Sequence, residues 1–155
     1  MSVIKQLIGE FNWGNLDYLI VDIPPGTGDE PLSIAQLIPN CDGAIIVTTP
    51  QDVALVSVRK SINFVKKMKL PIIGIVENMS GFICPHCKKN IDIFKSGGGK
   101  KASEDFNVPL LGQIPLDAQI VKGGDSGEPF ILQNKKSTTS QSFEKIIQNI
   151  KKQVE

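Results

Sequence analysis

The sequence has little net charge, few aromatic residues and no long apolar run, and each shortage excludes a class of function. Its 155 residues carry a formal net charge of +1, so we expect no basic surface for nucleic acid. Aromatic residues make up 6% of the chain, which leaves few platforms on which single-stranded bases could stack. Apolar runs such as Ala44–Val47 are far too short to span a bilayer, so we expect no membrane partner either.

Cysteine is also scarce. The three cysteines are odd in number and two have CxxC spacing, which fits a reducing cytosol better than a disulfide framework. No signal-peptide pattern is found at the start of the sequence, and we expect a cytoplasmic protein. With 41% apolar residues the chain is long enough to bury a real core, so residues 1–155 are expected to form a single domain.

Apolar strand-like runs alternate with segments of helical period. The predicted strands are Leu19–Ile23, Ala44–Thr48, Pro71–Val76 and Leu110–Pro115. Helices are predicted over residues 2–12, over Pro31–Leu37, from Asp52 onwards, near 100–106, and in a C-terminal stretch striped by Phe143, Ile146, Ile147, Ile150 and Val154. Apolar strands separated by helices indicate an α/β three-layer sandwich around a mainly parallel sheet.

Two details near the C-terminus complete this prediction. Residues 133–141 are polar enough to form a loop before the last helix. The apolar stripe of that helix can pack on the sheet or lie on a membrane surface, and we favour packing on the sheet.

An acidic, glycine-containing turn follows the first predicted strand. In the run Val21–Asp29 (VDIPPGTGD), Asp22 can act on Mg²⁺ through a water, and the Gly26 N–H can reach a γ-phosphate. Asp29 can orient water or contact a partner subunit. The alternative is a tight turn in which Asp22 has no part in chemistry. We favour the nucleotide interpretation, because ligands of such folds gather at the carboxyl ends of strands.

A second motif, Cys84-Pro85-His86-Cys87, places two thiols at metal-ligand spacing. Two thiolates are half of a Cys₄ metal site, which a second copy of the chain can complete across a two-fold axis. The alternative is a pair of inert or redox-active thiols. His86 lies between the two ligands in the sequence and is not expected to join them. Cys41 is distant from the pair, and we expect it to be a buried small hydrophobic residue.

Three runs together resemble one family. Asp22–Glu30, Thr48–Gln51 and Val76–Phe82, the last leading into Cys84–Cys87, resemble the Mrp-type iron–sulfur cluster carrier ATPases, relatives of the septum-positioning and chromosome-partitioning P-loop ATPases. The resemblance runs from about Gly14 to Ile131.

The resemblance implies a cytosolic homodimer that binds ATP with Mg²⁺ and carries a [4Fe-4S] cluster for delivery to apo-proteins. Cys84 and Cys87 of two chains would hold the cluster, and residues 78–98 would be an inserted metal-binding loop. Asn78 would contact the adenine, and the turn containing Pro115 and Asp117 would close over it. Asn78 can also be a plain turn former, and Asp117 can cap the next helix.

The family's phosphate-binding loop has no match in this sequence. Family members begin with a strand and a G-K-G-G-V-G-K-[ST] loop. Here the one Gly/Lys cluster, Ser96–Lys101, has Phe94 where the first glycine belongs and Lys101 where Ser or Thr must ligate Mg²⁺. We interpret it as a loop and helix start.

The missing loop has two expected consequences. The family's loop strand lies between the strands ending at Asp22 and Thr49, so both would lose a neighbour, and the 155-residue chain alone should bind ATP poorly and hydrolyse it negligibly. A second chain that supplies the loop is a candidate partner.

Two other functions stay open. One is a partitioning or septum-type ATPase switch on DNA or membrane, against which the thiol pair and the lack of a basic surface argue. The other is a zinc-stapled dimerisation or scaffold module without catalysis, which the missing loop favours.

Overall fold

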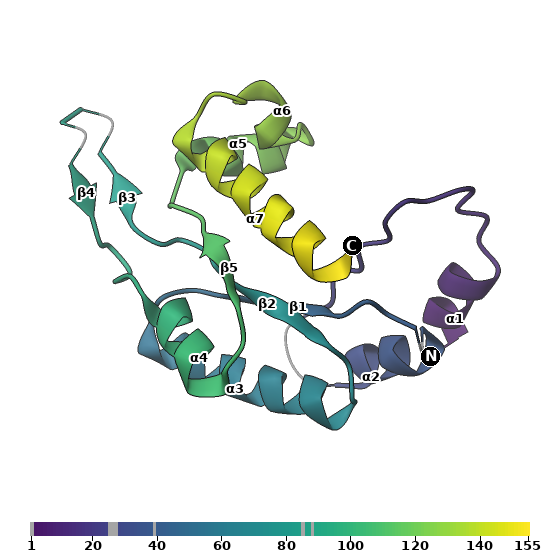
Figure 1. Cartoon of the computed structure of the whole chain (residues 1–155). Coiled ribbons are helices and arrows are strands. Elements are labelled where there is room, and N and C mark those ends of the chain that lie inside the picture. The colour runs from purple at the N-terminus through teal and green to yellow at the C-terminus, as the bar shows by residue number, and fades with distance from the viewer. Residues whose placement is uncertain (1, 25–27, 39, 85, 88) are drawn as a thin grey trace.

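A parallel sheet with helices on both faces forms the centre of the molecule (Figure 1). The computed structural model describes residues 2–24, 28–38, 40–84, 86–87 and 89–155. The sheet has the strand order β1-β2-β5, from β1 (Ala44–Thr48), β2 (Ile72–Glu77) and β5 (Leu110–Gln113). Helices α3 (Asp52–Lys67) and α4 (Gly98–Phe106) cover one face and α7 (Thr138–Val154) covers the other. The predicted α/β sandwich is confirmed.

Each face of the sheet has its own apolar core. Beneath α3, buried side chains at helical spacing pack against β1 and β2; they are Leu55, Val58, Ile62 and Val65 from the helix and Ile46 and Ile75 from the strands. Beneath α7, Ile146 packs against Val76 and Leu111. Each such side chain contributes roughly 1.5–3 kcal/mol when fully buried. The predicted packing of the C-terminal stripe on the sheet is therefore confirmed.

Shorter elements surround the sandwich. Near the N-terminus, α1 (Ser2–Gly9) contacts α2 (Asp29–Leu37). A small antiparallel hairpin, β3 (Phe82–Ile83) and β4 (Asn90–Ile91), follows β2, and α5 (Ala118–Ser126) and α6 (Phe130–Gln133) precede α7. None of the helices in the described ranges is both long and apolar enough to cross a bilayer.

Two predicted boundaries are wrong. The first helix ends at Gly9 rather than at residue 12. The predicted loop 133–141 ends early, because the Ser137 hydroxyl accepts a hydrogen bond from the Ser140 N–H at 3.0 Å and so caps α7, which begins at Thr138.

The predicted strand Leu19–Ile23 is also wrong. Residues 18–24 have no regular secondary structure and their side chains are exposed, Ile20 by 89%. An extended segment gains stability by pairing with a neighbour, and in the described part of the chain no strand pairs with this segment or with the outer edge of β1. Beside this unpaired edge, Ile45 and Val47 of β1 are 38% and 63% exposed. Asp22 therefore lies in an irregular segment rather than at the end of a strand.

Candidate functional site

The carboxyl ends of the three parallel strands meet at one edge of the sheet and bring two predicted residues close together. The Asn78 N–H donates to the Thr48 carbonyl at 2.7 Å, joining the ends of β2 and β1. The Ile114 N–H donates to the Glu77 carbonyl at 2.8 Å and the Ser80 N–H to the Ile114 carbonyl at 2.9 Å. Asn78 and the turn at Pro115 therefore lie on adjacent segments.

Glu77 is the residue at this edge to which the sequence assigned no role. It is fully buried, and its carboxylate accepts hydrogen bonds from four groups: the Gly97 N–H at 3.1 Å, the Gln113 side-chain amide at 2.8 Å, the Gly99 N–H and the Ser80 hydroxyl. The signal for it was an acid at the end of the apolar run Ile72–Val76. Its hydrogen-bond partners could not be found by spacing.

These donors keep Glu77 ionised. Burial by itself raises the pKa of the Glu77 carboxyl, but the two side-chain and two backbone hydrogen bonds outweigh it, so the pKa lies below its ordinary value. An acid whose pKa is lowered by folding stabilises the protein above its unfolded pKa. That stabilisation is lost as the pH falls through the lowered value.

The glycine-rich segment before α4 is built around this carboxylate. Gly97 has φ +83° and is the N-cap residue immediately before α4. A Cβ at Gly98 would lie 2.4 Å from the Pro50 carbonyl oxygen, and one at Gly99 would lie 2.9 Å from the Glu77 Cβ. Our interpretation of Ser96–Lys101 as a loop and helix start is confirmed. Its amides bind an internal acid where a phosphate loop would bind phosphate.

Asn78 and Asp117 have the local roles considered as alternatives. The Asn78 Oδ1 accepts from the Met79 N–H at 2.9 Å, and Met79 has φ +57°, as in a tight turn. The Asp117 carboxylate caps α5 by accepting from the Gln119 N–H at 2.9 Å, and accepts from the Thr139 hydroxyl at 2.8 Å. Asp117 thereby ties the Pro115 turn to the start of α7.

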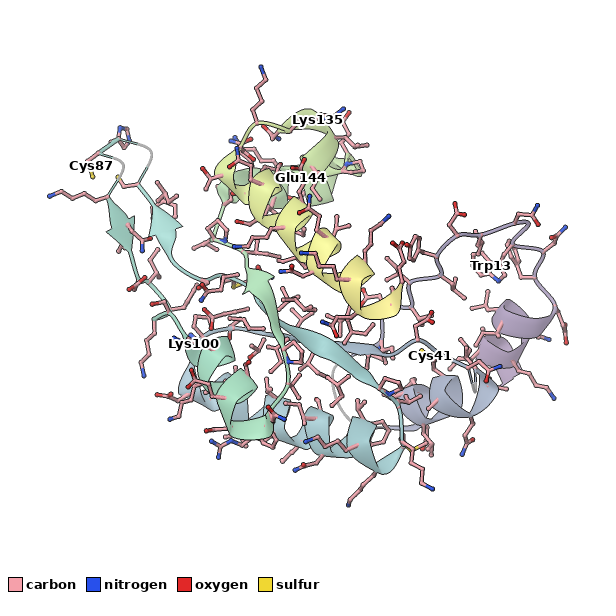
Figure 2. All side chains as sticks on the ribbon, in the orientation of Figure 1. Trp13, Cys41, Cys87, Lys100, Lys135 and Glu144 are labelled. Atoms are coloured by element: carbon pink, nitrogen blue, oxygen red, sulfur yellow. The ribbon has the colours of Figure 1, made fainter. Side chains whose placement is uncertain are left out.

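The thiol pair lies on the β3–β4 hairpin, which extends from the strand-end edge away from the sheet; Figure 2 shows Cys87 at its tip. Cys84 is half-buried and its N–H donates to the Lys89 carbonyl at 3.0 Å, which closes the hairpin. Cys87 and His86 are exposed. In the described ranges no third cysteine, histidine or carboxylate joins a metal-binding group. One chain therefore presents two sulfur donors here.

The remaining predicted residues are not gathered at this edge by a strand. Asp22 is exposed in the irregular segment 18–24, and Asp29 is the exposed first residue of α2, where its carbonyl accepts from the Ser33 hydroxyl at 2.6 Å. Gly26 lies outside the described residues. Cys41, expected to be buried, is half-buried, with its thiol donating to the Gly43 carbonyl at 3.6 Å.

Solved structures similar to this chain include a nucleotide-binding protein and a cell division ATPase. The chain is similar to the nucleotide-binding protein of Archaeoglobus fulgidus solved with ADP, at 34% identity and a TM-score of 0.72 over 90% of this chain and 59% of that one. It is also similar to the cell division ATPase MinD of Pyrococcus furiosus, at 27% identity and a TM-score of 0.67 over 97% of this chain and 56% of that one.

A family model described as ParA, NUBPL iron-transfer P-loop NTPase, matches residues 1–151. The chain is 51% identical to the iron-sulfur cluster carrier protein of Methanocaldococcus jannaschii over 99% of its length, and 53% identical to that of Saccharolobus solfataricus over 99%. It is 48% identical to the cytosolic Fe-S cluster assembly factor CFD1 of Saccharomyces cerevisiae over 98%. The chain belongs to this family of iron-transfer P-loop NTPases. It spans 52%, 52% and 54% of the lengths of these three relatives.

Proposed function

We propose that this chain is the cluster-holding part of an iron–sulfur cluster carrier. Two copies would each contribute Cys84 and Cys87 to one [4Fe-4S] cluster on the two-fold axis of a homodimer. The observation that carries the proposal is the hairpin: Cys84 and Cys87 lie in the turn between β3 and β4, and in the described residues no further ligand completes a site there. The names of the similar proteins support iron–sulfur cargo.

Delivery to an apo-protein is then an exchange of ligands. Four iron–thiolate bonds to the carrier break and four form to the acceptor, whose thiols release the protons that the carrier's thiolates take up. No iron changes oxidation state. An exposed hairpin tip suits this exchange, because an incoming thiolate can reach the cluster before all the carrier's bonds have broken. Residues 78–98 would form the metal-binding insertion of a single domain 1–155, acting in the cytoplasm.

The strand-end edge is the proposed nucleotide side. Asn78, Pro115 and Asp117 would line the adenine, while Asp22, Gly26 and Asp29 would serve Mg²⁺ and the γ-phosphate of ATP once a phosphate loop is present. The bare edge of β1, with Ile45 and Val47 exposed, supports a neighbouring strand supplied by another segment or chain. Pairing that strand with β1 would give residues 18–24 a neighbour and place Asp22 beside it.

Anaerobic reconstitution with iron and sulfide tests the cluster assignment. Wild-type chain should give a brown dimer whose absorbance at about 400 nm comes from thiolate-to-iron charge transfer. Cys84→Ala combined with Cys87→Ala should abolish both colour and dimer, whereas the matched control Cys41→Ala should keep them. Colour that survives the double substitution would contradict the assignment.

Metal analysis of the same samples separates the zinc alternative. A carrier should contain iron and acid-labile sulfide in equal amounts, because a [4Fe-4S] cluster holds four of each. A structural zinc site would give one zinc per two chains in anaerobically prepared protein and no sulfide, and it would point to a scaffold module instead.

A further inference from the structure

Glu77 is the only charged residue among those the structure describes that is buried. No Lys, Arg or His in the described ranges forms a salt bridge with it. Its charge is balanced instead by four donors from three segments: Ser80, Gly97 and Gly99 together, and Gln113. Two of these are N–H groups at the start of α4, where the helix dipole favours negative charge. A buried anion with this many donors fixes all of them relative to one point.

Two of the donors control the base of the β3–β4 hairpin. Ser80 is two residues before β3, and its hydroxyl and N–H are held by Glu77 and by the Ile114 carbonyl. Gln113 ends β5, immediately before the segment that runs beside the hairpin base, where the Leu116 N–H donates to the Gly81 carbonyl at 2.8 Å. The carboxylate is therefore one of the links that hold the hairpin base, together with these backbone hydrogen bonds.

We propose that Glu77 is a positioning residue, which locks the hairpin base to β5 and to the start of α4 and so sets where Cys84 and Cys87 stand. The inference rests on the proposed function for its purpose, since the two thiols must meet those of a second copy. Whether Glu77 holds the hairpin can be tested in the metal-free chain, without a cluster.

The four donors around Glu77 require a carboxylate as their common acceptor. An ionised carboxylate only accepts hydrogen bonds, and all four surrounding groups donate. A glutamine keeps the size but brings an NH₂ group, so at least one donor would face another donor and lose its acceptor. Glu77 also packs tightly against α4: a Cβ at Gly99 would lie 2.9 Å from the Glu77 Cβ, so only glycine fits there.

The test compares three variants by alkylation of the metal-free chain. Glu77→Gln removes the charge, Ser80→Ala removes only the link to the hairpin base, and Glu104→Gln makes the same chemical change on the exposed side of α4. Mass spectrometry follows Cys41, Cys84 and Cys87 separately. Cys84 and Cys41 are both half-buried, while Cys87 is exposed, so each chain carries its own internal controls.

Cys84 should react about tenfold faster in Glu77→Gln, because loss of a hydrogen bond to a charged group raises the open population by about that factor. Ser80→Ala should act in the same direction, with a severalfold increase. Cys41 and Cys87 should be unchanged, and Glu104→Gln should match the wild type. Equal acceleration of Cys41 and Cys84 would mean a merely structural role and would overturn the proposal. So would unchanged Cys84 in both Glu77→Gln and Ser80→Ala.

If Glu77→Gln fails to fold by circular dichroism, Ser80→Ala decides the question, since it keeps the buried charge and three of its donors. Anaerobic reconstitution of the same variants separates the two proposals. Selective acceleration of Cys84 in a chain that takes up no cluster would support the positioning role and contradict the carrier function. The opposite result would be a cluster that a chelator removes equally fast from wild type and Ser80→Ala, together with unchanged alkylation of Cys84. It would support the carrier function and contradict the positioning role.

Discussion

At the scale of single residues, the strand-end edge depends on groups that have no room for change. Gly98 approaches the backbone of Pro50 so closely that an added Cβ would meet its carbonyl oxygen at 2.4 Å, while a Cβ at Gly124 in α5 would have nothing within 4 Å. The two glycines both lie in helices, so one substitution can have opposite effects at the two positions.

We expect Gly98→Ala to destabilise the chain by about 1–3 kcal/mol, because the backbone of Pro50 must move to admit the methyl group. Gly124→Ala should stabilise it by about 0.5–1 kcal/mol through higher helix propensity alone. Urea denaturation followed by circular dichroism measures both. A Gly98→Ala chain as stable as the wild type would show that the start of α4 does not pack against Pro50.

The same residues show what spacing can reveal. The thiol pair was found in the sequence because Cys84 and Cys87 are three positions apart. The Glu77 site was not, because three of its four hydrogen-bond partners lie 20, 22 and 36 positions away and meet only when β2, α4 and β5 have folded together. Glu77 could be noticed as an acid ending an apolar strand, and its role could not.

At the scale of elements, the apolar pattern predicted a strand or helix correctly wherever the folded chain provides a partner for its apolar face. The predicted strands at Ala44–Thr48 and Pro71–Val76 and the helix from Asp52 form as expected, because apolar faces of both kinds find partners in the same core. Leu19–Ile23 has as strong an apolar pattern and forms no strand, since strand formation is a property of a pair. Its apolar sequence is typical of a buried strand, but the described structure contains no strand that pairs with it.

Substituting two isoleucines by alanine tests this difference directly. Ile75→Ala, in a side chain with 0% exposure, should cost about 2–5 kcal/mol through lost burial and the cavity left behind. Ile20→Ala, at 89% exposure, should change stability by less than about 0.5 kcal/mol in the 155-residue chain. Denaturation midpoints in urea give both values. A cost above about 2 kcal/mol at Ile20 would show that the segment is buried in a sheet after all.

At the scale of the whole molecule, two features of the described structure are incomplete: the proposed metal site on the hairpin and the outer edge of β1. The hairpin offers two sulfurs, and in the proposed homodimer a second copy would supply the other two that a cubane cluster needs. Among the described residues no strand pairs with the outer edge of β1, and the chain spans about half the length of its curated relatives. The proposed cargo site and the proposed nucleotide site therefore lie in different parts of the chain and can be tested separately.

We expect the purified 155-residue chain to hydrolyse ATP no faster than buffer and to bind it weakly. In the described structure, the Gly97 and Gly99 N–H groups at the start of α4 already donate to Glu77. A phosphate could bind these groups only by displacing that buried carboxylate. Phosphate release with Mg²⁺ and calorimetric titration with ATP measure the two quantities, with Lys101→Ala as the matched variant. Magnesium-dependent turnover that Lys101→Ala abolishes would show that Ser96–Lys101 binds phosphate and that the Glu77 cradle opens. Turnover unaffected by that substitution would place a phosphate site elsewhere in the chain, and would equally contradict the expectation.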